Sequence, residues 1–487
     1  MAEPKPMYAF IQSAAPWLNP HIKSYIKRHV REVIFVDEFE DIPANPKRVF
    51  QFCDGWELTR NFALGNNAEA SLINAYPNSD ALARKDLLAS VAEYWGAKRP
   101  ESNLKNHVPL TVRLRLDYAE YVEDALMEAD NLELLYSLEE NSEKDASERE
   151  WWILKPALID CGAGIRLFST VDELAGHLEL AEYEYDDDEE SDESEASVKI
   201  EKVEEGDNGP YMTAVQADQV NLDFLVNATG TLSMDDSSKT SRKSRRPQYV
   251  FKENGRIPSA QMRAFVAQRY IAAVPTIDSR KWHARAYVLC VGRLKVYVFK
   301  ELLALLAGEN YQPPWENPSL KASLTNTGLQ EEEDFIKKES MRDYWKVSDD
   351  LLPGEWKKRA FEQMCSISSE IVRAAAYTMA DKFTVLNKNF ELFAADFLLD
   401  TTGNVWLLEM NETPAFYQHG VAGPIAKRLM ESVITIALEH MGAPLSQDVD
   451  NEAVKDRFVL AVDESETMAK SNIRQIVSED DAATSLR

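Results

Sequence analysis

Two apolar segments near the end of the chain constrain its fold most strongly, because each carries an acidic residue. The first, 390–399 (FELFAADFLL), alternates as a β-strand does and contains Asp396 between alanine and phenylalanine residues. The second, 405–410 (VWLLEM), contains Glu409, and Asn411 follows on the same face of the strand. The linker Asp-Thr-Thr-Gly has the composition of a hairpin turn. The two strands are therefore expected to pair, with Asp396 across from the edge that carries Glu409 and Asn411.

A carboxylate inside such a strand is costly to bury unless it is paired or bound to a metal. Asp396, Glu409 and Asn411 together offer two carboxylates and an amide oxygen. These are hard oxygen donors, which suit a magnesium ion that bridges nucleotide phosphates. A pair of buried structural salt bridges is the alternative that the pattern alone leaves open.

A lysine at the end of an apolar strand is the second feature. Lys155 closes the segment 152–154, and a loop of small residues with Gly162 and Gly164 follows it. A point charge beside exposed backbone amides is a recurring way to hold phosphate. Neither a GxxxxGK nor a GxGxxG spacing is present, so the Walker and Rossmann classes are excluded. An ordinary connecting loop remains the alternative.

A cationic row is the third feature. On the strand that begins near Trp282, alternate residues place Lys281, His283, Arg285 and Tyr287 on one face. Such a row is not expected to pack into a core, and Lys281 and Arg285 can neutralise a phosphoryl group during transfer. A solvated sheet face is the alternative.

Length and charge narrow the class of protein. A chain of 487 residues holds two or three compact domains, and its formal charge is −28. The run 182–207 contributes −12, so the remainder is still acidic, which disfavours direct binding to nucleic acid or anionic membranes. We expect no membrane span and no signal peptide. The four cysteines form no metal-ligand spacing and indicate reduced thiols in a cytoplasmic protein.

The order of patterns predicts an α+β fold. We expect a small N-terminal α/β domain over residues 1–70, then a ligase domain over 71–445, and a polar, loosely held tail over 446–487. Disordered inserts are predicted at about 182–210 and 232–247, because both stretches are poor in apolar residues. Their opposite charges and their serines allow mutual attraction and phosphorylation, and inert solvated loops are the alternative. Residues 139–150 are interpreted as a polar loop, and a helix is predicted from about Asp80.

These blocks together resemble the tubulin tyrosine ligase-like family of ATP-grasp enzymes. The resemblance covers roughly residues 75–440, and its motifs occur in the family order. They are LARKDL (82–87), ILKPALIDCGAGI (153–165), QRYI (268–271), RKWHARAYVL (280–289), LTN (324–326) and the two apolar segments described above. The resemblance implies an ATP-grasp fold, in which two α+β subdomains grip ATP.

The resemblance also implies roles for individual residues. ATP contacts are expected from Lys155, Gly162, Gly164, Gln268, Arg269, Tyr270, Ile271, Lys281 and Asn326. Magnesium is expected on Asp396, Glu409 and Asn411, with Arg285 and Lys281 as catalytic residues. The protein substrate is expected near Arg84, Lys85, His283 and Thr325.

Four positions depart from the family pattern. His283 stands where an aspartate is usual, and Ser323 where a histidine often precedes Leu-Thr-Asn. Leu305 stands where tyrosine ligases have a second arginine, and Glu412-Thr413-Pro414 replaces Gly-Ala-Pro. The ending EMNETPAFYQHG is closer to fungal members, some of which are linked to cytoplasmic RNA processing bodies. The nucleotide half thus matches the family, whereas the acceptor half is altered.

Three functions follow from this resemblance. The first is an ATP- and magnesium-dependent ligase that adds a free amino acid to a protein carboxylate, such as an α-tubulin tail. The second is an ATP-holding or degenerate scaffold that binds proteins of a ribonucleoprotein granule. A ligase for small molecules stays open, because the nucleotide motifs do not specify the acceptor.

Overall fold

The computed structural model describes residues 6–53, 70–158, 164–179, 263–317, 319–325 and 339–471. Gly162, Asn326 and both predicted inserts lie outside these residues, so the expectations for them stay predictions. None of the helices in the described ranges combines the length and the apolar composition needed to cross a lipid bilayer.

The chain begins with a parallel four-stranded sheet in the order β2-β1-β3-β4. Its strands are β1 (Met7–Gln12), β2 (Val33–Val36), β3 (Arg48–Cys53) and β4 (Ala70–Ile73). Helix α1 (Asn19–His29) connects β1 to β2 and buries Ile22 and Ile26 one turn apart. This arrangement matches the α/β character predicted for the N-terminal part.

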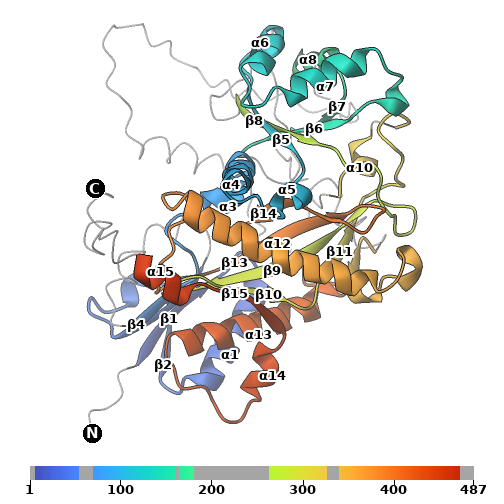
Figure 1. Cartoon of the computed structure of the whole chain (residues 1–487). Helices are drawn as coiled ribbons and strands as arrows, with labels where there is room; N and C mark the ends of the chain where they lie inside the picture. Colours follow the sequence, from blue (N-terminus) through green and yellow to red (C-terminus); the bar gives the residue numbers. More distant parts are fainter. Residues whose placement is uncertain are drawn as a thin grey trace, which may run out of the picture.

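A seven-stranded sheet forms the centre of the molecule (Figure 1). The long strand β9 (Trp282–Val291) pairs with β10 (Lys295–Phe299) and β11 (Leu303–Leu306) along one side and with β13 (Phe390–Leu399) along the other. Strand β14 (Val405–Asn411) pairs with β13, as predicted for the hairpin. Strands β12 (Met341–Asp343) and β15 (Phe458–Asp463) lie beyond β11 and β10 at one edge, and β14 forms the opposite edge.

A smaller lobe lies above this sheet in Figure 1 and contains a second four-stranded sheet, in the order β5-β8-β6-β7. Its strands are β5 (Thr111–Arg115), β6 (Trp152–Pro156), β7 (Arg166–Phe168) and β8 (Ala264–Arg269). Helices α6 (Val122–Met127), α7 (Glu133–Ser142) and α8 (Val171–Glu179) cover its outer face. The short helices α3 (Asp80–Ala83), α4 (Lys85–Lys98) and α5 (Leu104–His107) lead into this lobe.

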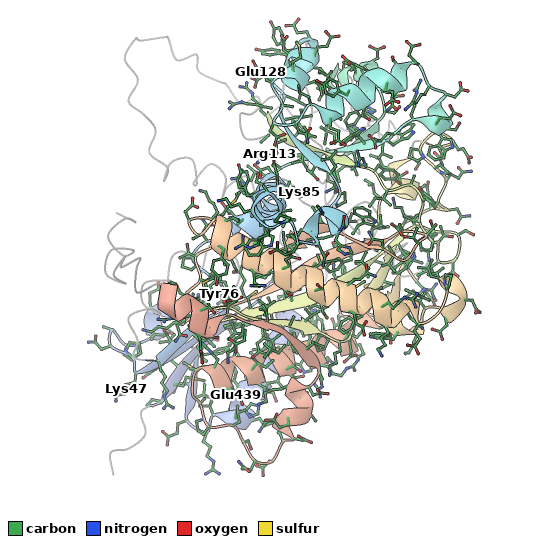
Figure 2. The ribbon with its side chains drawn as sticks, viewed as in Figure 1. Lys47, Tyr76, Lys85, Arg113, Glu128 and Glu439 are labelled. Carbon is green, nitrogen blue, oxygen red and sulfur yellow. The ribbon has the colours of Figure 1, made fainter. Side chains whose placement is uncertain are left out.

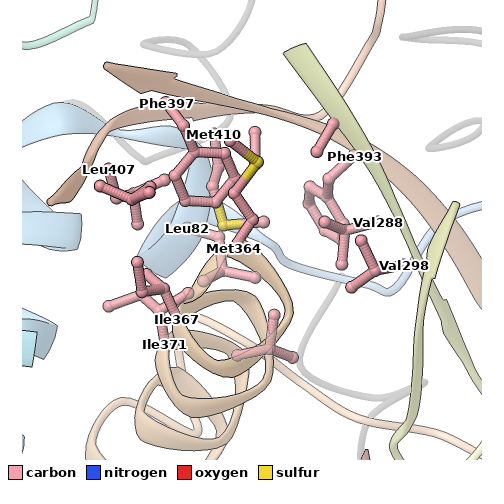
Figure 3. Packing of buried hydrophobic residues seen from close by; sticks show 14 of the residues in the cluster. Leu82, Val288, Val298, Met364, Ile367, Ile371, Phe393, Phe397, Leu407 and Met410 are labelled. Carbon is pink, nitrogen blue, oxygen red and sulfur yellow. The ribbon is translucent and has the colours of Figure 1, made fainter. Parts of the chain in front are cut away.

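Helices bury both faces of the large sheet. On one face, α12 (Trp356–Thr378) packs Met364, Ile367 and Ile371 against strand residues such as Phe393 and Phe397 (Figure 3). On the other face, α13 (Ala422–His440) packs together with α1 and the N-terminal sheet in one shared cluster. The N-terminal unit is therefore joined to the ligase part through a common core.

Three local expectations need correction. Residues 133–142 form α7, so the predicted loop at 139–150 is partly helical, because Leu134 and Leu138 reach the core of the small lobe. The helix predicted from Asp80 is interrupted at Arg84, which has an extended backbone. The predicted loose tail is wrong for residues 451–471, because β15 completes the open edge of β10, with α14 (Asn451–Lys455) before it and α15 (Ser465–Ser471) after it.

Candidate ATP-binding site

A pocket of about 640 Å³, including its open mouth, lies between the small lobe and the end of the large sheet. The small lobe contributes Ile153, Lys155 and Ile165 from β6 and the segment beyond it, and the hinge at 268–271 follows β8. The large sheet contributes Lys281, His283, Asp396 and Glu409. Most of the residues predicted for ATP thus border one cavity.

Lys155 points into the pocket from strand β6. Its side chain is buried, and its Nζ donates to Oε1 of Gln268 at 2.8 Å. Burial lowers the pKa of Lys155 to about 8; Glu409 and Asp396 oppose this decrease and Lys85 reinforces it. The residues of the predicted glycine loop lie outside the described part except Gly164, whose φ of 72° is in the left-handed region that favours glycine.

The hinge at 268–271 continues from strand β8. Gln268 donates to the hydroxyl of Thr111 at 3.1 Å, and this bond, with the bond from Lys155, fixes its amide. Tyr270 donates its hydroxyl proton to the carbonyl oxygen of Ser323 at 3.3 Å. Arg269 borders the pocket, but its guanidinium forms ion pairs with Glu133 and Glu150. The arginine side chain is therefore committed to the small lobe and is not placed to contact phosphate.

Lys281 lies against the hinge. Its Nζ is 3.8 Å from the centroid of the Tyr270 ring and donates to the carbonyl oxygen of Ile271 at 3.1 Å. Burial lowers its pKa well below the usual value, and the neighbouring charge of Lys155 adds to the effect. This ammonium group is oriented toward the part of the pocket that the hinge forms.

His283 is the next residue on the same face of β9. Its Nδ1 is 2.6 Å from the hydroxyl oxygen of Thr325, and its Nε2 is 3.4 Å from Oδ1 of Asp396 without a well-aligned hydrogen bond. The imidazole therefore connects the segment that contains Thr325 to the strand that carries Asp396. Leu305 on strand β11 pairs with His283 on β9 and is fully buried. The position at which tyrosine ligases have a second arginine is therefore part of the core in this chain.

Arg285 and Asp396 face each other on β9 and β13. Both guanidinium–carboxylate distances are 2.8 Å, which is a bidentate ion pair. Burial by itself would raise the pKa of Asp396, but Arg285 and then His283 hold it well below its ordinary range. The expected cationic row is therefore buried, and its Arg285 is neutralised by a carboxylate.

Glu409 pairs with Asp396 across the β13–β14 hairpin, as expected. The register shifts directly after this pair, so Leu408 is an extra residue in β14. A bulge of this kind turns successive side chains to one side, and both Leu408 and Glu409 border the pocket. Asn411 donates to Oε1 of Glu409 at 3.5 Å. The alternating pattern of the sequence gave no sign of this bulge.

The donor set is suited to a magnesium ion. No group of three His, Cys, Asp or Glu side chains within the described ranges is arranged for a metal, so the donors are two carboxylates and one amide. Magnesium typically takes one or two carboxylates and completes its shell with water and phosphate oxygens. Each Asp396 oxygen keeps a second lone pair beside its bond to Arg285. The residues present therefore fit this ion together with a bound nucleotide.

Lys85 begins α4 and lies between the two lobes (Figure 2), and Arg84 directly precedes it at the N-cap of this helix. Arg84 is held by two hydrogen bonds to Asp86, of 3.2 and 2.8 Å. The Nζ of Lys85 is 4.0 Å from Oε2 of Glu409, and Lys85 shares a small adjoining cavity with Lys155. Of the residues predicted for the substrate, His283 and Thr325 line the pocket and Lys85 lines the adjoining cavity, whereas Arg84 is not among the residues that border either one.

Several pocket residues were not predicted from the sequence to belong to the site. Ile153, Ile165, Leu398 and Leu408 form apolar walls, and Ser323 is buried with a hydroxyl that has no partner among the described residues. Ile153 could have been predicted from the strand pattern, because it lies two residues before Lys155 on one strand and so shares its face. Ser323 and the walls depend on contacts between segments that are distant in the chain.

The combination of two α+β lobes around this pocket is an ATP-grasp fold. A crystal structure of the C-terminal domain of K. lactis Pby1 aligns with a TM-score of 0.57 over 94% of this chain and 99% of that chain, at 20% identity. That domain is described as an ATP-grasp enzyme that interacts with the mRNA decapping enzyme Dcp2. At this identity the likeness establishes the fold alone. It confirms the predicted fold class.

The chain belongs to the tubulin-tyrosine ligase family, whose model matches residues 64–451. A probable tubulin–tyrosine ligase of Schizosaccharomyces pombe is 32% identical over 458 residues, which cover 94% of this chain and 96% of the relative. The probable tubulin–tyrosine ligase PBY1 of Saccharomyces cerevisiae is 30% identical and matches 92% of this chain. The match covers only 53% of that longer relative. The predicted resemblance to fungal family members is confirmed.

Proposed function

We propose that the chain is an ATP- and magnesium-dependent ligase that joins an amino acid to a protein carboxylate. The observation that carries this proposal is the pair of buried lysines, Lys155 and Lys281. Neither ammonium group has a carboxylate within ion-pair distance among the described residues; their bonds go to an amide oxygen and a carbonyl oxygen. Buried cations without counter-charges are costly, so this wall is suited to a polyanion such as a triphosphate.

In this proposal, different residues around the pocket bind different parts of the nucleotide. The backbone at 268–271, together with Tyr270 and the apolar walls, is suited to the base, and Lys281, whose Nζ lies against the Tyr270 ring, would meet the phosphate nearest the base. Lys155 and Lys85 are placed toward the phosphates, because both lie near Glu409. Asp396, Glu409 and Asn411 would hold magnesium. When bound, that ion supplies charge neutralisation and alignment of the phosphate oxygens.

Arg285 acts on this arrangement through Asp396. The bidentate pair holds the carboxylate in one orientation and keeps it ionised. Arg285 is thus a positioning residue in the described structure, and contact with the transferring phosphoryl group would require the pair to loosen.

The proposed chemistry needs no nucleophilic side chain. A carboxylate oxygen of the acceptor attacks the γ-phosphorus, and ADP leaves with the electrons of the broken P–O bond. The amine nitrogen of the amino acid then attacks the acyl carbon, phosphate leaves, and the nitrogen loses a proton. Positioning and charge neutralisation carry most of the catalysis of such steps.

Binding of nucleotide is the first test. ATP with magnesium should raise the melting temperature, and Asp396→Asn and Lys155→Met should each reduce the increase. Lys98→Met, which removes an exposed lysine from the far end of α4, is the matched control. An unchanged melting temperature for the wild-type protein would contradict the proposal.

Transfer of an amino acid is the second test. The relatives are named as probable tubulin–tyrosine ligases, so α-tubulin with labelled tyrosine is the first pair, followed by glutamate and glycine. Incorporation that requires ATP and is lost in Asp396→Asn supports a ligase. If ATP binds and no amino acid is incorporated into tubulin, the acceptor proposal fails while the nucleotide proposal stands.

A protein-binding scaffold in the cytoplasm is the second candidate function. It is favoured by the fold shared with the Pby1 domain, which is described as interacting with a decapping enzyme. Recombinant decapping enzyme should then be retained by this chain and equally by an Asp396→Asn/Glu409→Gln variant. A ligase that recognises this protein only as a substrate would instead lose binding when ATP is withheld or the site is changed.

A further inference from the structure

The outer surface of the small lobe carries apolar and acidic side chains side by side. Ten large hydrophobic residues are exposed in the described part of the chain, and four of them fall between residues 121 and 136. We define the acidic face as Asp124, Met127 and Glu128 on α6 with Leu132, Tyr136 and Glu139 at α7. All six are exposed. Such a density is unusual for a region with no packing role.

Helical periodicity accounts for this arrangement. Helix α6 directs Val122 and Leu126 into the core of the lobe, so Asp124, Met127 and Glu128 lie on its outward side. Met127 is 58% exposed. Figure 2 shows Glu128 at the end of this lobe, far from the large sheet. The outward side of α6 therefore carries both acidic and apolar side chains.

Helix α7, the next helix of the lobe, shows the same division into a buried and an exposed side. Leu134 and Leu138 are buried, while Leu132 and Tyr136 lie one turn apart on the opposite side. Tyr136 is 60% exposed, and Glu139 follows it on the same side. Helices α6 and α7 pack against each other and are joined by residues 128–132, so both outward sides belong to the exposed end of the lobe.

The charges of the acidic face are not compensated. No described lysine or arginine lies within ion-pair distance of Asp124, Glu128 or Glu139. At the border of the face, by contrast, Asp130 pairs with Arg113 and Glu133 pairs with Arg269. The local potential is therefore negative around exposed apolar side chains.

The acidic face is separate from the ATP pocket. Strand β6 directs Trp152 and Leu154 toward α6 and α7, and Ile153 and Lys155 toward the pocket. The sheet of the small lobe thus lies between the two sites. Occupation of one does not require a residue of the other.

We infer that the acidic face is a docking site for a basic segment of another protein that carries an aromatic or aliphatic side chain. Charge complementarity selects a cationic partner, and Met127, Leu132 and Tyr136 provide the apolar contact. An acidic partner such as a glutamate-rich tail is repelled here. The inference does not depend on the proposed ligase activity.

The chain has a basic stretch of its own at 239–246, outside the described residues. The acidic run 182–207 lies in the same part of the chain and carries a net charge of −12. Along the chain it is closer to that stretch than the acidic face is, and it carries more negative charge. A partner in trans is therefore the occupant that the charges favour.

The test uses the full chain and a labelled synthetic peptide of lysine, arginine, glycine and serine with one central tryptophan. Fluorescence anisotropy compares the wild type with Asp124→Lys/Glu128→Lys/Glu139→Lys. The control, Glu32→Lys/Glu355→Lys/Asp381→Lys, changes net charge equally at exposed positions elsewhere. We expect the face variant to lose about tenfold or more in affinity and the control to lose far less. Tyr136→Ser should weaken binding of this peptide, and it should not weaken binding of a matched peptide that lacks the tryptophan.

Two outcomes would overturn the inference. Equal losses in the two triple variants would mean that the peptide follows the overall charge of the chain. The second outcome is that the wild-type chain does not bind the peptide but a variant of its basic stretch does. In that variant alanine replaces Lys239, Arg242, Lys243, Arg245 and Arg246. The chain's own segment would then occupy the face. Thermal unfolding of both triple variants, with and without ATP, separates either result from a folding defect or from failure of the nucleotide proposal.

Discussion

Arg285 on strand β9 and Asp396 on strand β13 form a bidentate ion pair in which both distances are 2.8 Å. Both side chains are nearly inaccessible to solvent, so the pair has little access to water. Removing one partner of a buried pair leaves an uncompensated charge, which commonly costs about 3–5 kcal/mol. The same pair fixes one of the proposed magnesium donors.

Replacement of Arg285 by leucine should therefore destabilise the protein by about 3 kcal/mol, with His283 reducing the cost because it lies 3.4 Å from Asp396. Arg342→Leu is the matched control, because Arg342 pairs with Asp278 and Glu339 at the surface and should cost less than about 1 kcal/mol. Urea unfolding at neutral pH measures both. Equal losses for the two variants would show that the Arg285 pair is not effectively buried.

Lys155 gives a prediction that separates stability from binding. Its pKa falls from 10.5 to about 8 on burial, so between these pH values the unfolded chain binds more protons and stability rises with pH. Below pH 8 the penalty is fully present. Lys155→Met should then stabilise the nucleotide-free protein at pH 7 by about 1–2 kcal/mol, after allowance for the lost bond to Gln268. A stability loss, measured by urea unfolding, would contradict this.

The same lysine predicts how ATP affinity depends on pH. The ammonium form attracts the triphosphate, and this form is lost as pH rises through about 8 in the empty pocket. Affinity should be nearly constant from pH 6.5 to 7.5 and should fall above pH 8 by at most about tenfold per pH unit. Isothermal titration calorimetry in buffers of different ionisation enthalpy should detect proton uptake above pH 8. Lys155→Met should bind weakly and with less uptake, which then comes only from Lys281, whose pKa burial also lowers.

The sequence allowed the metal-site strands to be predicted because their signals are local. Asp396 and Glu409 each interrupt an apolar run, and the turn between the runs sets their pairing, which the β13–β14 register reproduces. The pairing of Asp396 with Arg285 was out of reach, because it depends on the register of strands more than a hundred residues apart. The direction of Arg269 likewise depends on Glu133 at the start of α7 and on Glu150 just before β6, which are both more than a hundred residues away in the chain.

The elements that were missed have different physical causes. The polar composition around 139–150 hid the last turn of α7, a helix whose two buried leucines hold it against the lobe. Strand β15 was missed because a polar tail surrounds its short FVLAVD segment, and only the open edge of β10 shows why it pairs. Both elements are stabilised mainly by tertiary packing.

Glu391 supplies the last prediction, because it is a buried carboxylate that accepts hydrogen bonds and has no ion-pair partner in the part of the chain that the structure describes. Its Oε2 accepts from the backbone of Tyr76 at 3.0 Å and its Oε1 from the hydroxyl of Ser79 at 2.9 Å, and these bonds connect β13 to the segment before α3. Burial raises its pKa from 4.5 to about 8, opposed by the bond from Tyr76 and reinforced by the charge of Glu412. The folded chain thus binds the extra proton between pH 4.5 and 8, so the contribution of this group to stability is fully present below pH 4.5 and is lost as pH rises through 8.

Glu391→Gln should remove this dependence, because a glutamine can accept from the Tyr76 amide and donate to Ser79. Relative to the wild type, the variant should be about equally stable at pH 5 and more stable by about 2–3 kcal/mol at pH 8. Urea unfolding at pH 5, 6.5 and 8 gives the difference, and Glu32→Gln, at an exposed position, should show none. If the difference between Glu391→Gln and the wild type stays constant across these pH values, the carboxylate is already ionised in the folded protein. Its two hydrogen bonds would then outweigh the cost of its burial.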